Sequence, residues 1–425
     1  MTRRRMNIAM AAVLLLSTTA RADVVSDWNT IMLSTVSGQN PFAQARFAAI
    51  THLAVFEAVN AITVSYQPYL GTVMAPQGAS AEAAAVAAAY RVLATYFPNS
   101  ITALDTARAT SLATIPEGSA RDVGLAVGEA AANAMIAART NDGSGPAEFY
   151  LSPSANPGQW QLTPSCQAAG GLLLHWRKVV PFGIQRADQF RSDPPPALIS
   201  SKYARDWNEV NTVGGIGSTE RPPDRADVAR FYATVAAPAV WNMVAAQAAA
   251  AQGISLSEKT RTFALLNMAL SDGAITAFET KYHYNFWRPE DAIRSAQTDE
   301  NSKTDADPSF LPFITAPCFP SYPSAHASLS NAAREVLERL YGGRPQSITL
   351  SSPAVAGVRL TYTKFKQITD DIDDARIYGG IHFRFDQEAG TEQGRRIGEY
   401  VYKENLGQTQ GCNCDQKSEA NRRRD

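Results

Sequence analysis

An all-α protein built from one or more helical bundles is the fold that this sequence predicts, and three observations lead to it. Apolar residues recur with helical spacing over long stretches, most clearly at 40–62 and 325–341. Residues that favour helix starts precede both stretches, with Asn40-Pro41 before the first and Ser324 before the second. Sustained alternation of apolar and polar residues does not occur, so we expect at most a short strand at 348–350.

Residues 23–225 are predicted to form an amino-terminal helical region with proline-rich loops. Ala-rich or apolar segments, the first two with suitable cap residues, place helices at 40–62, 80–97 and 119–139, and residues 206–213 are expected to form a short helix before a Gly-rich turn. Prolines recur too often between 143 and 196 for long regular elements, which indicates a functional or linking loop region. His175 and Trp176 in that region either line a pocket or pack in the core, whereas His52 in the first helix is typical of a core histidine.

Residues 226–407 are predicted to form a carboxyl-terminal helical bundle that carries an anion site. A long helix over 227–251, bent at Pro238, comes first. The next helix opens with the capping box Ser255-x-x-Glu258 and continues towards residue 287.

Two cations lie near the end of this second helix. Lys281 and Arg288 are seven residues, about two turns, apart and would project from one face if the helix persisted to Trp287. Pro289 then ends it. The pair could bind an anion or merely complement the helix dipole.

The segment 315–341 is a Pro-punctuated loop that delivers a helix N-terminus. Ser324 occupies the N-cap position, and His326 lies in the first turn. A helix N-terminus offers unpaired backbone N–H groups and a positive dipole end, so this loop is suited to an oxyanion. An ordinary capped helix with a surface histidine is the competing interpretation.

A third segment near the carboxyl terminus carries an arginine, a histidine and an aspartate. Gly379-Gly380 should break the helix there, so that Arg376 and His382 converge from either side of a turn. Asp386 is expected one turn beyond His382 on the same helix. A carboxylate at that spacing can fix one imidazole nitrogen, raise the basicity of the ring, and leave the other nitrogen free as a ligand or nucleophile.

The two ends of the chain are expected to lie outside the folded part. Residues 1–22 have a basic start, an apolar run and a small-x-small cleavage signal, which predicts a secretory signal peptide and a periplasmic or secreted protein. A membrane anchor is the alternative, but the apolar run is shorter than the ~20 residues that span a bilayer. Residues 408–425 are polar and charged and are predicted to be a disordered tail.

Charge argues against a nucleic-acid partner. The chain has 39 basic and 40 acidic residues, and the first 22 residues hold four arginines and no acid, so the remainder carries a net charge of −5. No segment after residue 22 approaches an unbroken apolar stretch of transmembrane length, so no stable membrane insertion is expected.

Four cysteines remain in the exported part, namely Cys166, Cys318, Cys412 and Cys414. An oxidising compartment favours disulfides, and four cysteines allow three pairings, among which the sequence does not choose. A zinc site is the competing idea, although Cys412-x-Cys414 has no neighbouring histidine.

Taken together and in order, Lys281-x6-Arg288-Pro289, Pro323-Ser324-Ala325-His326 and Arg376-x5-His382-x3-Asp386 resemble a known three-part signature. Vanadium-dependent haloperoxidases share it with the type 2 phosphatidic acid phosphatase and bacterial acid phosphatase superfamily. The longer stretches KYHYNFWRPEDAIR, FPSYPSAHAS and YGGIHFRFD are similar to the soluble chloroperoxidase branch. The likeness covers nearly the whole chain after residue 22 and implies the helical-bundle fold of that superfamily.

The resemblance also implies a role for each residue of the signature. Lys281, Arg288 and Arg376 would clamp the equatorial oxygens of bound vanadate, and Ser324 and the Ala325 N–H would add hydrogen bonds. His326 would be the acid–base group, and Asp386 would orient His382. The resemblance makes His382 the axial nitrogen ligand of vanadium or, in a phosphatase, the nucleophile.

The sequence departs from the family pattern at two positions. Ala325 stands where the family usually has glycine, so its methyl group could crowd the backbone, and Ala375 replaces the usual serine before the arginine. Phe278 and Phe319 stand where haloperoxidases place aromatic residues beside the halide site, although aromatic residues are also common in helical cores.

Three functions compete at this point. The first is a vanadate-dependent haloperoxidase whose substrates are hydrogen peroxide and halide. The second is an exported acid phosphatase that hydrolyses phosphomonoesters through a phosphohistidine and needs no vanadate. The third is an inactive helical scaffold, against which the complete set of Lys281, Arg288, Arg376 and the two histidines argues.

Overall fold

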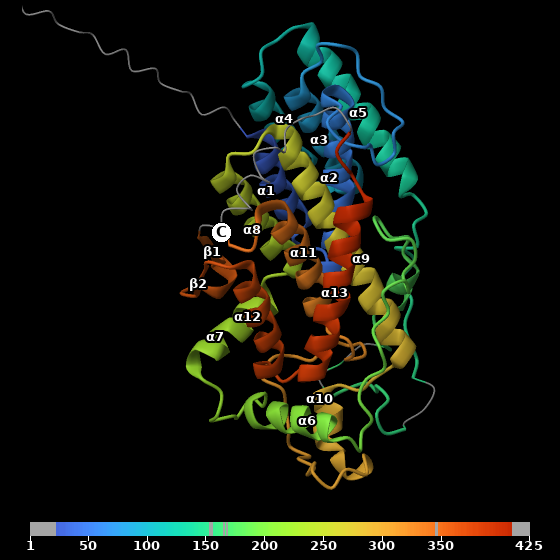
Figure 1. Cartoon of the computed structure of the whole chain (residues 1–425), viewed down its shortest axis with the longest axis vertical. Coiled ribbons are helices and arrows are strands. Elements are labelled where there is room, and N and C mark those ends of the chain that lie inside the picture. The colour runs from blue at the N-terminus through green and yellow to red at the C-terminus, as the bar shows by residue number, and fades with distance from the viewer. Residues whose placement is uncertain (1–22, 153–155, 165, 167–168, 345–346, 410–425) are drawn as a thin grey trace, which may run out of the picture.

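The computed structural model describes residues 23–152, 156–164, 166, 169–344 and 347–409, and in these ranges nearly all of the regular secondary structure is helical (Figure 1). The all-α prediction is therefore confirmed. A small antiparallel hairpin pairs β1 (Ile348–Ser351) with β2 (Arg359–Tyr362), and only the first of these strands was expected. The predicted signal peptide, the cysteines at 412 and 414 and nearly all of the predicted tail lie outside the described residues.

The described residues of the amino-terminal part form six α-helices and two short 3-10 helices, at Pro98–Ser100 and Leu174–Lys178. The α-helices are α1 (Val24–Val36), α2 (Pro41–Thr63), α3 (Ala81–Tyr96), α4 (Ile101–Leu112), α5 (Ser119–Ala138) and α6 (Ser201–Val213). The predicted caps Asn40 and Ser80 accept hydrogen bonds from the first-turn N–H groups of α2 and α3. The helices α1 and α4 were not expected, and α6 begins five residues earlier than the 206 expected for it.

Seven α-helices and two short 3-10 helices, at Ala296–Thr298 and Pro353–Val355, follow in the described carboxyl-terminal part. The α-helices are α7 (Pro223–Thr234), α8 (Ala237–Gln252), α9 (Leu256–Tyr284), α10 (Pro289–Arg294), α11 (Ala325–Tyr341), α12 (Phe365–Tyr378) and α13 (Arg384–Glu404). The single bent helix expected over 227–251 is wrong, since α7 and α8 are separate. Pro238 explains the break, because its ring would clash with the carbonyl of residue 234, the residue at which α7 ends, and it sits in the first turn of α8 without needing an N–H partner.

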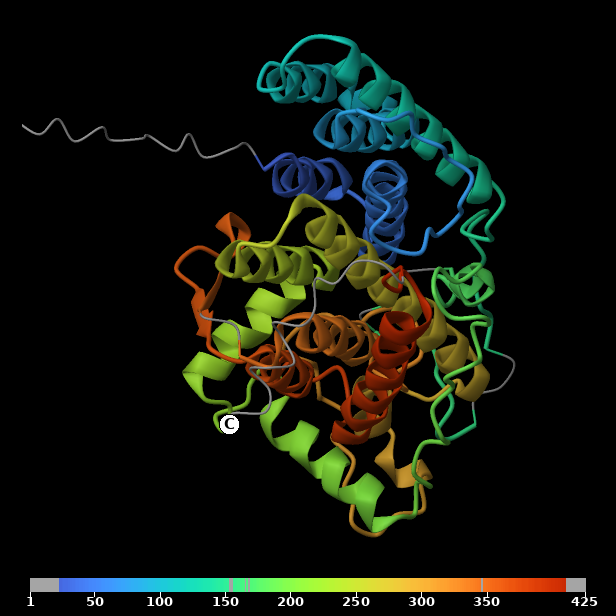
Figure 2. The ribbon, with the colours of Figure 1, turned by 45° about the horizontal axis from the view of Figure 1, so that its top comes forward.

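The two parts share a large hydrophobic core, and a second, smaller cluster includes residues of α6 and α10. The long helix α9 packs against α2, α11, α13 and α8, while α3 and α5 stack on the far side of α2 (Figures 1 and 2). The helix α2 has the length and hydropathy of a membrane span, but 83% of its apolar window is buried inside the protein, as in a core helix. The helices α9, α11, α12 and α13 surround the segments that carry the predicted anion site.

A seam of glycines brings α13 unusually close to α11. A Cβ atom added at Gly390, Gly394 or Gly398 would lie 2.2–2.5 Å from backbone oxygens of α11 and its cap. These positions are four residues apart and therefore share one face of α13. Because only glycine permits this approach, the seam fixes the start of α13 against the N-terminus of α11.

Candidate active site

Lys281 and Arg288 do not lie on one helix, which corrects the sequence prediction. The helix α9 ends at Tyr284, Asn285 adopts a left-handed conformation, and Arg288 is the extended N-cap residue of α10. The two cations are nevertheless neighbours, because both donate to the carbonyl oxygen of Pro320. Their common partner is the loop before α11, not a helix face.

The ammonium group of Lys281 is buried, and carbonyl oxygens of that loop accept hydrogen bonds from all three of its protons. Its Nζ donates to the carbonyl oxygens of Pro320 (3.0 Å), Ser321 (2.6 Å) and Pro323 (2.6 Å). An ammonium has three protons to donate, so a further oxyanion contact requires one carbonyl to be exchanged. Lys281 therefore organises the loop as well as supplying charge.

Arg288 connects the same loop to the segment that carries His382. Its Nε donates to Phe319 O (2.8 Å) and its Nη2 to Pro320 O (3.3 Å). Its Nη1 lies 2.8 Å from Ile381 O and 3.1 Å from His382 Nε2. Since a guanidinium only donates, Nε2 of His382 accepts, and the ring proton is on Nδ1.

His382 lies in the connection between α12 and α13, not on the helix of Asp386 as expected. The connection contains Gly380 with a φ of 77°, a conformation open to glycine, and α13 begins only at Arg384. The predicted pairing still forms, with His382 Nδ1 2.8 Å from Asp386 Oδ2. The N–H of Phe383 also donates to this carboxylate oxygen (3.1 Å), which holds Asp386 at the start of α13.

Arg376 reaches the site from the last turn of α12 and has donors to spare. Its Nη1 lies 3.0 Å from His326 Nε2, while its Nε and Nη2 are buried and have no protein partner within the described residues. Buried donors without acceptors are rare in folded proteins and usually mark a place for a ligand or ion. Two such donors on one guanidinium fit an oxyanion such as vanadate or phosphate.

The N-terminus of α11 completes the arrangement as predicted. Ser324 is the N-cap residue, and its Oγ accepts from the Ala327 N–H (3.3 Å). Ser324 N donates to Asp386 O (2.9 Å), which links this helix start to the start of α13. Ala325 begins the helix without a positive φ, so the alanine that replaces the family's glycine causes no backbone strain there.

Burial sets the charge states of the site. It lowers the pKa of His326 and of His382 well below 6.5, and the neighbouring cations lower both further, so both imidazoles are neutral at neutral pH. Burial also lowers the pKa of Arg288 to about 9 and that of Arg376 to about 10, and both stay protonated at neutral pH. Burial and the cations therefore set the net direction for His382, and the expectation that Asp386 raises the basicity of this ring stays a prediction.

The two aromatic residues noted in the sequence pack against each other beside the cations. The Phe278 and Phe319 rings meet edge to face with centroids 5.0 Å apart, and Phe42 from α2 contacts both. Arg288 Cζ lies 5.0 Å and Lys281 Nζ 5.4 Å from the Phe319 ring centroid. These rings form an apolar wall of the site, and their contact with halide stays a prediction.

The remaining histidines named from the sequence lie elsewhere. His52 is buried, stacks on Phe263 and has its Nε2 3.0 Å from Asn29 Oδ1, as expected of a core residue. His175 is buried and its Nδ1 accepts from the Glu148 N–H (3.2 Å), so it packs in the loop region. Neither contacts the anion site.

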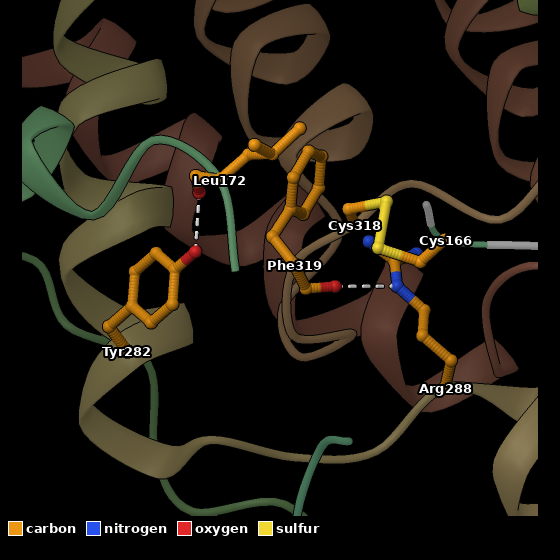
Figure 3. The surroundings of a disulfide bond; sticks show 6 residues. All are labelled: Cys166, Leu172, Tyr282, Arg288, Cys318 and Phe319. Carbon is orange, nitrogen blue, oxygen red and sulfur yellow. Dashed lines mark hydrogen bonds between the residues drawn. A yellow bond between two sulfur atoms is a disulfide. The ribbon is translucent and has the colours of Figure 1, made fainter. Parts of the chain in front are cut away.

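A disulfide joins Cys166 to Cys318 and thereby connects the proline-rich region to the loop of the site (Figure 3). Leu172 N donates to Cys318 O (2.8 Å), and Tyr282 of α9 donates through its hydroxyl to Leu172 O. Figure 3 also shows the next residue, Phe319, whose carbonyl accepts from Arg288. The disulfide therefore restrains the backbone on which Arg288 depends.

Breaking this disulfide is expected to destabilise the protein and weaken oxyanion binding together. Cross-links of this kind contribute ~2–5 kcal/mol. We expect Cys166→Ser/Cys318→Ser to lower the Tm and to raise the vanadate Kd, because the Phe319 carbonyl is no longer fixed. Reductant should shift the Tm of the wild type but not that of the double variant. A wild-type Kd unchanged by reductant would contradict the link to the site.

Lys281→Met is expected to lower stability far more than Arg376→Ala. The first change leaves the Ser321 and Pro323 carbonyls without their Lys281 donor, at about 1–3 kcal/mol for each unpaired group, while the Pro320 carbonyl keeps Arg288 as a donor. The second removes two donors that lack protein partners in the described residues and one contact, between Nη1 and His326 Nε2. Urea unfolding of both variants measures the difference, and equal midpoints would show that Lys281 does not organise the loop.

Ser321 is the residue of this site that sequence reasoning missed. Its Oγ donates to Asp386 Oδ2 (2.5 Å) and lies 3.2 Å from His382 Nδ1, and its carbonyl accepts from Lys281. The loop motif gave no signal for it, because a serine in a proline-rich segment is typical of a turn.

Comparison with known proteins agrees with this geometry. Residues 261–411 match the family model of the VCPO second helical-bundle domain. The vanadium chloroperoxidase of Curvularia inaequalis is 23% identical over 277 residues, which cover 49% of this chain and 44% of that protein. The match thus spans less than half of the curated relative's length.

Solved structures match over a larger share of the chain. A bacterial vanadium-dependent iodoperoxidase has 26% identity and a TM-score of 0.76, covering 91% of this chain and 96% of that one. The holo form of a bacterial vanadium-dependent chloroperoxidase has 15% identity and a TM-score of 0.70, covering 87% and 93%, and this second likeness concerns the fold alone.

Fold and site together define an all-helical protein with a buried cationic site for an oxyanion, flanked by two neutral imidazoles. The comparisons then show which proteins the chain is similar to: its residues 261–411 match a helical-bundle domain model of the vanadium chloroperoxidases, and its fold is that of a bacterial vanadium-dependent iodoperoxidase.

Proposed function

We propose that the protein is a vanadate-dependent haloperoxidase that oxidises halide with hydrogen peroxide. The observation that carries the proposal is the pair of buried, unpartnered donors on Arg376, which face no protein acceptor within the described part of the chain. The similarity of this chain to vanadium-dependent haloperoxidases supports vanadate as the oxyanion. When bound, vanadate would supply the activation of hydrogen peroxide for attack by halide.

Most residues of the site would hold the anion. Arg376 offers two donors at once. Arg288 and Lys281 supply positive charge, and their donors can move from the loop carbonyls to the anion. Charge–charge attraction and hydrogen bonds are stronger in a buried environment than in water. Ser324 and the Ala325 N–H would add hydrogen bonds at the N-terminus of α11. Such preorganised donors offset the cost of removing an oxyanion from water.

The two histidines would have different tasks. His382 has its proton on Nδ1, so its Nε2 lone pair can bond vanadium once the Arg288 donor gives way. His326 is partly exposed and neutral, so it can take up and return protons. Asp386 keeps the His382 ring in the orientation and tautomer that this bond requires.

Phosphomonoester hydrolysis is the second candidate, and one observation favours it. The unprotonated Nε2 of His382 lies beside three buried cations, which is also the arrangement that a phosphohistidine mechanism needs. In this reading His326 would protonate the leaving group, and no vanadate would be required.

One experiment tests both candidates. Halide oxidation is followed with hydrogen peroxide, with and without added vanadate, beside hydrolysis of a phosphomonoester by the same vanadate-free preparation. We expect halide oxidation only with vanadate. Hydrolysis without halide oxidation would favour the phosphatase, and a preparation inactive in both assays would contradict both.

We also propose that the protein acts outside the cytoplasm after removal of residues 1–22. The amino-terminal sequence pattern and the Cys166–Cys318 disulfide support an oxidising compartment. Amino-terminal sequencing of the mature protein from cell fractions would test it.

A further inference from the structure

Ser321 lies at the one point where three parts of the site meet. Its backbone N–H donates to Phe286 O (2.9 Å), just before Arg288, and its carbonyl accepts from Lys281. Its hydroxyl faces His382 and Asp386. The side chain is fully buried, so no solvent competes for these contacts.

The hydrogen-bond directions around this hydroxyl follow from its partners. Asp386 only accepts when ionised, so Ser321 donates its proton to Asp386 Oδ2. The lone pairs of Oγ then face His382 Nδ1, which carries the ring proton because Arg288 donates to Nε2. The Nδ1–H is thus shared between Asp386 Oδ2 at 2.8 Å and Ser321 Oγ at 3.2 Å.

We infer that Ser321 is a positioning residue that locks the His382–Asp386 pair, so that Nε2 of His382 faces the oxyanion. This inference rests on the proposed function, because it concerns the same site. The Oδ1 atom of Asp386 has no partner in the described residues, so the carboxylate is held only through Oδ2. The Ser321 hydroxyl contacts this Oδ2 atom and also Nδ1 of His382, and it therefore holds the two side chains together.

The test compares Ser321→Ala with a matched control, Ser330→Ala. Ser330 is equally buried, lies on α11, and its hydroxyl has no partner in the described residues. We expect Ser321→Ala to raise the Kd for vanadate, and for inorganic phosphate, about 10–100-fold, the usual loss when a partner behind a ligating histidine is removed. Ser330→Ala should bind as the wild type does, and Ser321→Thr, which keeps the hydroxyl, should recover most of the affinity.

A second readout needs no anion. In protein labelled with ¹⁵N-histidine, the His382 Nδ1–H resonance, identified by its loss in His382→Ala, should move in Ser321→Ala and stay in Ser330→Ala. In an Asp386→Asn background, Ser321→Ala should cost little further affinity, because both residues act through His382. Should Ser321→Ala fail to fold, Ser321→Cys replaces it with the same expected direction.

The outcomes separate cleanly. A shifted resonance together with weaker binding supports the inference. An unshifted resonance, or unchanged affinity for both anions, overturns it, as does full additivity with Asp386→Asn. If the wild type binds phosphate but not vanadate, the haloperoxidase proposal fails, while the phosphate and resonance arms still decide the role of Ser321.

Discussion

Arg376→Ala is expected to raise the vanadate Kd about 100-fold or more. Arg376 Nε and Nη2 are buried without protein partners, so an oxyanion gains two charge-assisted hydrogen bonds from them. Each such bond contributes about 1.5–3 kcal/mol, and 1.4 kcal/mol is tenfold in affinity. Titration with vanadate, followed by the protein's intrinsic fluorescence or by calorimetry, measures the loss.

Two further variants sharpen this experiment. Arg376→Lys keeps a charge but offers a point charge in place of the planar fork, so its affinity should fall between the wild type and Arg376→Ala. Arg359→Ala removes an exposed arginine on β2 and should leave the Kd unchanged. If Arg376→Ala bound vanadate as tightly as Arg359→Ala, the oxyanion would not lie at Arg376.

The two histidines are expected to differ in what their loss removes. His382→Ala should abolish the bond to vanadium and, in a phosphatase assay, the trapped phosphoenzyme, because Nε2 of His382 carries the available lone pair. His326→Ala should keep measurable vanadate binding but lose most turnover, since removing a general acid–base group typically costs 10²–10⁴-fold in rate.

Acid-quench trapping with labelled phosphate and vanadate titration decide between the two roles. His52→Ala is unsuitable as a control, because it would open a cavity in the core, whereas the exposed His283 can be replaced without touching the site. A phosphoenzyme that survives in His382→Ala and disappears in His326→Ala would reverse the assignment.

Several elements were predictable because their signals are local. The caps Asn40, Ser80, Ser255 and Ser324 start helices where expected. Such a side chain accepts a hydrogen bond from a backbone N–H only two or three residues further on, so the signal is local. The residues of the three motifs were also named correctly as neighbours, and their contacts with one another are now visible. Their roles in binding stay predictions.

The wrong predictions concern which helices or connections carry the motif residues. Lys281 and Arg288 were expected on one helix face and His382 on the helix of Asp386, but a left-handed Asn285 and the Gly380 turn place Arg288 and His382 in connections between helices. Local propensity did not forbid longer helices at either place. The tertiary contacts of the 319–323 loop, which offers its carbonyls to both cations, favour the observed ends.

By itself the sequence determined the all-helical class, the capped starts of α2, α3, α9 and α11, and most of the residues that meet at the site, because periodicity, capping and motif chemistry act over a few residues. Only the tertiary structure decided that Cys166 pairs with Cys318, that glycines 390, 394 and 398 seat α13 on α11, and that Ser321 joins His382 to Asp386. These contacts join residues far apart in the chain, and they depend on close backbone approach and buried hydrogen bonds that local sequence signals do not encode.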